Sequence, residues 1–147
     1  MVPNMNAPRL QFSRYETGEN PQITIIWMHG LGDEGASFHT LFSTQLEHFD
    51  LTGLPAIRFI FPNAPERPIT AHSWLPARAW FDIYTDFEER DMEDEQGVID
   101  STGLIHILIN NEMAATAMTG SAAADLNRKA NLIKYGAIVV SSLPIMT

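Results

Sequence analysis

A glycine-rich turn with the sequence HGLGDEG spans His29–Gly35 and follows the apolar run ITIIWM. Gly30, Gly32 and Gly35 match the spacing G-x-G-x-x-G, which is typical of loops that cradle the pyrophosphate of a dinucleotide. The same letters can instead form a loop that aims backbone N–H groups at an oxyanion on a carbonyl substrate. The two chemistries require different residues elsewhere in the chain.

The dinucleotide interpretation lacks its acidic partner. A dinucleotide fold places a carboxylate at the end of the following strand, where it binds the ribose. Here that strand ends in FPNAP, and Asp50 comes before the strand instead of at its end. Asp33 and Glu34 also put two negative charges inside the loop, where they would repel phosphate. The residues therefore disfavour a nucleotide site.

The oxyanion interpretation fits the loop better. A His-Gly turn after a buried strand can point its N–H groups at the carboxyl edge of a sheet, where α/β proteins bind their ligands. We expect the N–H of Leu31 to be one donor to the oxyanion, with Gly30 and Gly32 allowing close approach of the backbone. A turn that only joins a strand to a helix is the alternative, and the loop alone does not decide between them.

Nucleophilic catalysis would need a serine hydrogen-bonded to a histidine base that an acid orients. The sequence has no G-x-S-x-G motif and no cysteine. The candidate serines are Ser37, Ser73, Ser121, Ser141 and Ser142. The histidines are His29, His39, His48, His72 and His106. No acid partner can be assigned to His72, and none of the histidines has the H-E-x-x-H or H-x-x-x-H spacing of a metal site.

Three buried strands and two helices are predicted to position the loop. ITIIWM, IRFIFP (Ile57–Pro62) and YGAIVVSSLP (Tyr135–Pro144) are apolar runs typical of strands covered on both faces. Helical spacing extends over about Ser37–Phe49 and Val98–Met113. The apolar face of the second helix is predicted to hold Leu104, Ile105, Leu108, Ile109 and Met113. The Pro-rich segment between these regions is predicted to be irregular, and the order of elements predicts an α/β fold with a mostly parallel sheet and flanking helices.

Length, composition and charge limit the classes of function that the protein can have. The 147 residues suit a single domain, with residues 1–20 expected to be a flexible or edge segment. The net charge of -9 and the absence of a Lys/Arg cluster argue against nucleic-acid binding. The acidic stretch Asp86–Glu95 is expected to be solvated. No signal peptide or integral membrane segment is recognisable, so a cytoplasmic protein is expected.

Four segments in order resemble the phospholipase/carboxylesterase family of α/β-hydrolases, which includes the acyl-protein thioesterases: TIIWMHGLGDEGASF, RFIFPNAPERPIT, RAWFDI and DEQGVIDS. The resemblance is specific from about Ile23 to Glu112. It implies an enzyme that hydrolyses carboxylic esters or thioesters, with lipidated proteins or lysophospholipids as substrates, and needs no cofactor. By position it implies Leu31 as the oxyanion donor and places Trp80 and Phe81 near the acyl pocket.

The catalytic centre of the family has no counterpart in this sequence. Family members follow the helix at Val98–Met113 with a strand and G-F-S-Q-G-G, whereas here ILINNEM leads into AATAMTGSAAADL. The resemblance thus implies a partial α/β-hydrolase fold that lacks the nucleophile-elbow strand and the C-terminal elements bearing the triad Asp and His. Three functions are compatible with it: a hydrolase impaired by loss of the triad, a non-catalytic acyl-binding or interaction protein, and a splice form or fragment without a function of its own.

Loss of the elbow strand from the sheet is expected to make the folded chain unstable or to cause it to associate with a second chain. The apolar runs ITIIWM and GAIVVS would lose ladder partners and need new neighbours. Because unpaired apolar strands recruit other chains, we expect either a marginally stable chain or a homodimer. Light scattering and calorimetry should give a dimeric mass or a broad, weak unfolding transition. A monomer with one sharp, cooperative transition would contradict this expectation.

Overall fold

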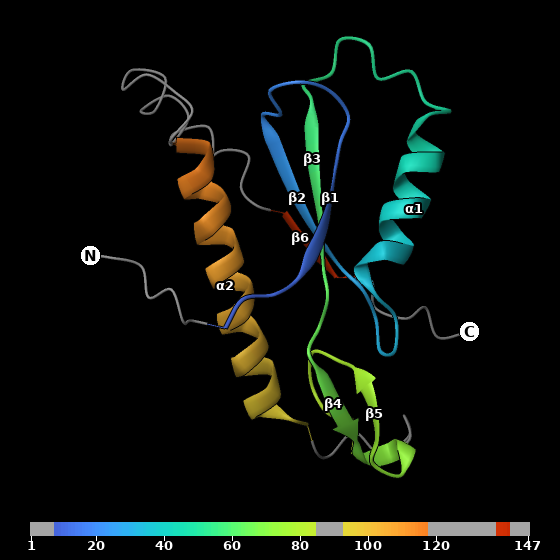
Figure 1. The fold of residues 1–147 in the computed structure, drawn as a ribbon, viewed down its shortest axis with the longest axis vertical. Helices are drawn as coiled ribbons and strands as arrows, with labels where there is room; N and C mark the ends of the chain where they lie inside the picture. Colours follow the sequence, from blue (N-terminus) through green and yellow to red (C-terminus); the bar gives the residue numbers. More distant parts are fainter. Residues whose placement is uncertain (1–7, 85–92, 118–137, 142–147) are drawn as a thin grey trace.

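The computed structural model describes residues 8–84, 93–117 and 138–141 of the chain. The elements in chain order are β1 (Phe12–Glu16), β2 (Ile23–Met28), α1 (Gly35–Leu46), β3 (Ile57–Pro62), β4 (Glu66–Ile69), the 3-10 turn η1 (Thr70–His72), β5 (Leu75–Arg78), α2 (Glu95–Ala117) and β6 (Ile138–Ser141). A central sheet lies between α1 on one face and α2 on the other, and the β4–β5 hairpin projects beyond one end of the sheet (Figure 1). Among the described residues, no helix is both long enough and apolar enough to cross a membrane.

The sheet is small and mixed, with the strand order β1-β3-β2-β6. β2 pairs in parallel with β3 on one side and with β6 on the other, with Ile25 opposite both Phe59 and Ile138. β1 runs antiparallel to β3, with Phe12 opposite Pro62. The predicted mostly parallel sheet is therefore wrong, because β1 reverses its direction. β1 alternates exposed and half-buried residues and has no apolar run to mark it in the sequence.

The two faces of the sheet bury different side chains. Toward α2, Ile26 and Ile60 form a core cluster with Leu108, and all three are at most 4% exposed. Toward α1, the rings of Trp27 and Phe42 meet edge to face with centroids 5.0 Å apart. This alternation follows from the two-residue period of a strand, and it explains why both faces of β2 are apolar.

The buried face of α2 contains an acid where the sequence predicted a methionine. Met113 is 42% exposed, whereas Glu112 is 8% exposed and lies one residue earlier. Glu112 is matched by two cations from the sheet: Arg14 Nη2 lies 2.6 Å from its Oε1, and Arg58 Nη1 lies 3.5 Å from its Oε2. Burial of a carboxylate is tolerated because these ion pairs compensate its lost hydration.

The Pro-rich segment is not irregular. β4 and β5 pair antiparallel from Glu66–Arg78 to Ile69–Leu75, with Pro68 opposite Pro76. Both prolines fit because each strand of a two-stranded ribbon has an edge that needs no N–H donor. A sequence-level rule that removes prolines from strands therefore misses this hairpin.

Gly35 allows α1 to begin directly against β3. A Cβ at this position would overlap the carbonyl of Phe61, whose carbon would lie 2.8 Å away. The Gly35 N–H also donates to Asn63 Oδ1 at 2.7 Å, just beyond the end of β3. The third glycine of the G-x-G-x-x-G spacing is thus required by helix–strand packing.

Substitution of Gly35 by alanine should destabilise the protein. Since the carbonyl of Phe61 belongs to a sheet strand and cannot move freely, we expect Gly35→Ala to lower the free energy of unfolding by about 1–3 kcal/mol. Urea titration followed by circular dichroism measures the change.

Gly103 provides the matched control within α2. A Cβ there would meet nothing within 4 Å, so Gly103→Ala should raise the free energy of unfolding by about 0.5–1 kcal/mol through helix propensity alone. Equal effects of the two substitutions would contradict the packing assigned to Gly35.

Candidate oxyanion site at the end of strand β2

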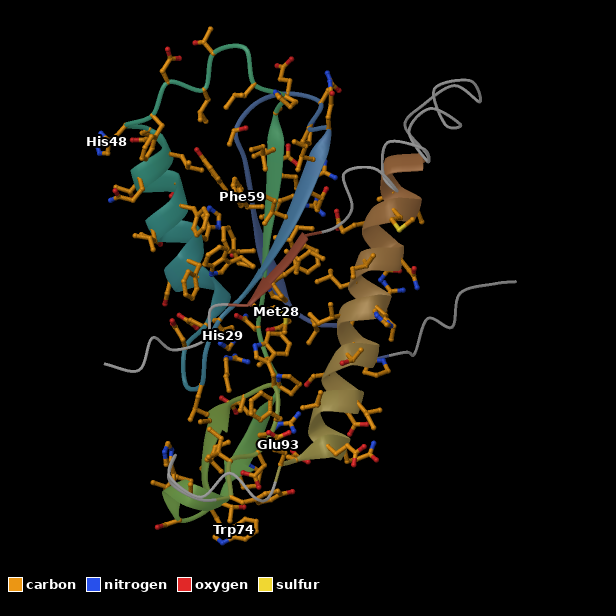
Figure 2. All side chains as sticks on the ribbon, turned by 180° about the vertical axis from the view of Figure 1, so that it is seen from behind. Met28, His29, His48, Phe59, Trp74 and Glu93 are labelled. Carbon is orange, nitrogen blue, oxygen red and sulfur yellow. The ribbon has the colours of Figure 1, made fainter. Side chains whose placement is uncertain are left out.

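The candidate site lies where β2 ends and the chain turns toward α1. Because β2 runs parallel to β3 and to β6, their carboxyl ends share one edge of the sheet. His29 follows β2 at this edge, between the sheet and the β4–β5 hairpin, while Trp74 lies at the far end of that hairpin (Figure 2). The loop thus occupies the edge at which open α/β sheets bind ligands.

His29 is a buried, fully hydrogen-bonded ring. It is 2% exposed, and its Nε2 accepts the Ala64 N–H at 2.9 Å. Since Nε2 must be unprotonated to accept this bond, the ring proton resides on Nδ1, which donates to the carbonyl of Gly30 at 2.7 Å. His29 is therefore neutral and both its nitrogens are engaged. It holds the loop and is not free to act as a general base.

The Gly30–Leu31 peptide is fixed through its carbonyl. The carbonyl of Gly30 accepts from His29 Nδ1 and also from the Asp33 N–H at 3.3 Å. A trans peptide is planar, so its N–H points opposite to its carbonyl, and fixing one fixes the other. Among the described residues, no acceptor binds the Leu31 N–H. The loop thus presents this amide in a defined direction.

Gly32 closes the turn on the other side of Leu31. Its φ of +76° lies in the left-handed region that favours glycine, and its N–H donates to the carbonyl of Arg78 at 2.8 Å. Gly32 therefore has a conformational role, and its own N–H is already used. The Leu31 N–H therefore lies between two residues that are each held by hydrogen bonds, Gly30 through its carbonyl and Gly32 through its N–H.

Trp80 supports the loop from the segment after β5. Its Nε1–H donates to the carbonyl of His29 at 2.8 Å, and the two rings lie 5.5 Å apart. The carbonyl of Trp80 in turn accepts a hydrogen bond from Ser101 Oγ on α2. Phe81, by contrast, is 44% exposed. Sequence reasoning placed Trp80 and Phe81 near the substrate but gave no sign of the Ser101 contact.

The structure does not assemble a catalytic pair from the candidate serines and histidines. Ser37 and Ser73 are exposed, and Ser73 lies in the hairpin turn with a φ of +55°. Ser141 ends β6 opposite Met28, and Ser121 and Ser142 lie outside the described residues. Among the side chains that the structure describes in residues 8–84 and 93–115, no serine hydroxyl is hydrogen-bonded to a histidine.

The other four histidines have surface or packing positions. His48, His72 and His106 are exposed. His39 on α1 stacks against Phe61, with ring centroids 5.9 Å apart. Within the described part of the chain, no group of three or more His, Asp or Glu side chains could hold a metal ion.

Asp94 corrects the expectation that the whole acidic stretch is solvated. Its side chain is 13% exposed and accepts backbone N–H bonds from Asp82 at 2.7 Å and from Gly97 at 2.9 Å. The bond to Gly97 is a helix N-cap for α2. These N–H donors, followed by the Arg67 guanidinium at 3.5 Å, lower the pKa of Asp94 from its ordinary value. Residues 85–92 of the stretch lie outside the described residues.

Tyr84 lies near the carboxylates of Asp94 and Asp82. Burial, together with the nearby charges of Asp94 and Asp82, raises the pKa of its phenol. Through the bonds that Asp94 accepts from Asp82 and Gly97, the segment after β5 is connected to the start of α2.

Architecture and loop together describe an α/β protein with a strand–turn–helix at the edge where its parallel strands end, and comparison with known proteins agrees. The structure matches that of Arabidopsis thaliana SOBER1 with a TM-score of 0.53 and 31% identity, covering 63% of this chain and 43% of that one. Residues 14–139 match the model of the Phospholipase/Carboxylesterase family. The chain belongs to this family.

Curated relatives give the same result over a limited length. Acyl-protein thioesterase 1 of Schizosaccharomyces pombe is 37% identical over 99 residues, which cover 65% of this chain and 41% of the relative. Carboxylesterase SOBER1 of Arabidopsis thaliana is 32% identical over 91 residues, covering 61% and 38%. The matched part of the chain thus spans about two fifths of the length of these relatives.

The lowered pKa of Asp94 predicts a pH-dependent contribution to stability. A carboxyl whose pKa is lower in the folded state stabilises the fold above its unfolded pKa, and this contribution is lost as the pH falls through the folded pKa. We expect Asp94→Asn to lower the free energy of unfolding by about 1 kcal/mol at about pH 7, because a neutral amide oxygen accepts the Asp82 and Gly97 N–H bonds more weakly than a carboxylate does. This difference from wild type should shrink as the pH falls below about 4.

Urea titrations at several pH values measure this effect, and Glu93→Gln is the control. Glu93 is exposed and adjacent, so its substitution removes the same charge without weakening the bonds that Asp94 accepts from the Asp82 and Gly97 N–H groups. A difference between wild type and Asp94→Asn that stays constant with pH would contradict the role given to the Asp94 carboxylate.

Proposed function

We propose that the loop after β2 is the oxyanion-binding part of a site for carboxylic esters or thioesters. In this proposal the Leu31 N–H donates to the substrate carbonyl oxygen as negative charge develops on it. The observation that carries the proposal is that the Leu31 amide has a fixed direction and no acceptor among the described residues. Membership of the Phospholipase/Carboxylesterase family supports acyl compounds as the ligand class, with lipidated proteins or lysophospholipids as candidate substrates.

The surroundings of Leu31 suit an acyl carbonyl. Gly30 and Gly32 carry no side chains that could block its approach. Trp80 and Phe81 are the proposed contacts for the acyl chain. The indole of Trp80 is held in place by its bond to His29, and the exposed ring of Phe81 has apolar surface that an acyl chain can cover. Neither metal nor organic cofactor enters this proposal.

Hydrolysis by this chain is proposed to be slow. Acyl transfer needs a nucleophile and a base that removes its proton. His29 cannot serve as that base because its Nε2 already accepts the Ala64 N–H. An oxyanion donor without a triad still stabilises the charge formed when water attacks, and so it leaves a residual acceleration.

A non-catalytic acyl-binding or interaction protein is the second candidate. The full engagement of His29 favours it, because the same bonds that exclude a base also make the loop rigid. Rigidity favours binding, since less conformational entropy is lost when the ligand is held. The two candidates differ in turnover and not in where the acyl group binds.

Hydrolysis of p-nitrophenyl octanoate, combined with a fluorophosphonate probe, tests the proposal. We expect slow hydrolysis and no covalently labelled serine. Replacement of Leu31 by its α-hydroxy acid converts the amide N–H into an ester oxygen and keeps the side chain. This replacement should lower the rate further, by a factor on the order of 100, the loss typical of one oxyanion donor.

Leu31→Ala is the matched control, because it removes the side chain and keeps the N–H. A rate that is equal in wild type and in the hydroxy-acid protein would contradict the oxyanion role of Leu31. Stoichiometric labelling of a serine would contradict the proposed slow hydrolysis. Binding of octanoate, together with no measurable hydrolysis of p-nitrophenyl octanoate, would favour the second candidate.

A further inference from the structure

Ser101 is a buried hydroxyl whose partner lies outside its own helix. It is 4% exposed on α2 and donates to the carbonyl of Trp80. The adjacent Thr102 is exposed and donates instead to the Val98 carbonyl within the helix, at 2.8 Å. A serine or threonine in a helix commonly bonds back to the preceding turn, so the outward bond of Ser101 distinguishes it from its neighbour.

The segment that Ser101 holds is the one that grips the loop. The carbonyl of Arg78 accepts the Gly32 N–H at 2.8 Å, and the indole of Trp80 donates to the carbonyl of His29 at 2.8 Å. These two bonds lie on either side of Leu31 in the sequence. Between them, the Ala79 N–H donates to the Pro65 carbonyl at 3.1 Å, which fixes the middle of the segment.

We propose that Ser101 is a positioning residue for the Leu31 oxyanion donor. It acts through the series of hydrogen bonds from Ser101 to Trp80, from Trp80 to His29, and from His29 to the carbonyl of Gly30. Ser101 touches neither the substrate nor Leu31. The inference rests on the proposed function of the Leu31 amide.

Loss of the hydroxyl would act at the start of this series. Without it, the carbonyl of Trp80 is left without its buried donor and the peptide can rotate. The indole N–H then moves relative to the carbonyl of His29, and the Gly30–Leu31 peptide loses one of its supports. Since oxyanion donors act through fixed direction, a small rotation weakens the interaction with the ligand.

Head-group selectivity, measured by NMR, tests the inference without requiring turnover. The full chain, labelled with ¹⁵N, is titrated with octanoate and separately with 1-octanol, and the Leu31 amide resonance is followed. Both probes have the same tail, but only octanoate offers an anionic oxygen to the amide. The measured quantity is the ratio of their dissociation constants, taken at a temperature at which every variant is fully folded.

Three variants are compared with wild type. Ser101→Ala should reduce the preference for octanoate about five- to tenfold, as expected when a hydrogen bond to a charged oxygen is weakened. Thr102→Ala, which removes the neighbouring exposed hydroxyl, should leave the ratio unchanged. Ser101→Thr keeps a hydroxyl at the position and should restore most of the preference.

The outcomes separate positioning from simple stability. If Ser101→Ala lowers the melting temperature but leaves the selectivity ratio unchanged, Ser101 is only structural and the inference is overturned. If Thr102→Ala changes the ratio as much as Ser101→Ala does, the inference is also overturned.

Failure of the proposed function gives a different result. In that case the Leu31 amide of the wild-type protein responds equally to octanoate and to 1-octanol. Hydrogen–deuterium exchange of the Gly32 amide, which donates to the carbonyl of Arg78, then still tests the positioning effect in the absence of ligand. Faster exchange in Ser101→Ala than in Thr102→Ala supports it, and equal exchange overturns it.

Discussion

The neutral ring of His29 is the interaction on which the loop depends. A buried imidazole must satisfy both nitrogens, and here one accepts from Ala64 beyond β3 while the other donates to the carbonyl of Gly30. These two bonds join the ends of adjacent parallel strands and set the plane of the peptide that carries the Leu31 N–H. A protonated ring could not accept from Ala64, so the fold requires the neutral Nδ1–H tautomer.

The predictable parts of the fold were those encoded in consecutive residues. The apolar runs located β2 and β3 at their observed bounds, and helical spacing located α1 and α2 within a few residues. β1 was missed because its register depends on β3, which follows about forty residues later. Glu112 was missed because its cations, Arg14 and Arg58, come from two strands distant in sequence. Such pairings are created by the tertiary fold and leave no local pattern.

In the candidate site, too, the sequence predicted the features encoded in consecutive residues and missed those created by the tertiary fold. The glycines and the family's motifs predicted a turn directly after β2, and the role of Leu31 as an oxyanion donor stays a prediction. The three glycines of that pattern nevertheless serve separate needs: the carbonyl of Gly30 anchors a peptide, Gly32 adopts a positive φ, and Gly35 makes room for the carbonyl of Phe61. The buried hydroxyl of Ser101 and the cap at Asp94 were not predictable, because serine and aspartate are common on exposed surfaces and only their partners reveal their roles.

The strand order has a consequence for how the chain folds as it is made. Synthesis delivers β2 early, and β3 soon completes one of its edges, but the partner on the other edge is β6, the last described strand. Until Ile138–Ser141 has left the ribosome, the second edge of β2 exposes unpaired N–H and C=O groups beside apolar side chains. During this interval that edge is open to pairing with a neighbouring chain.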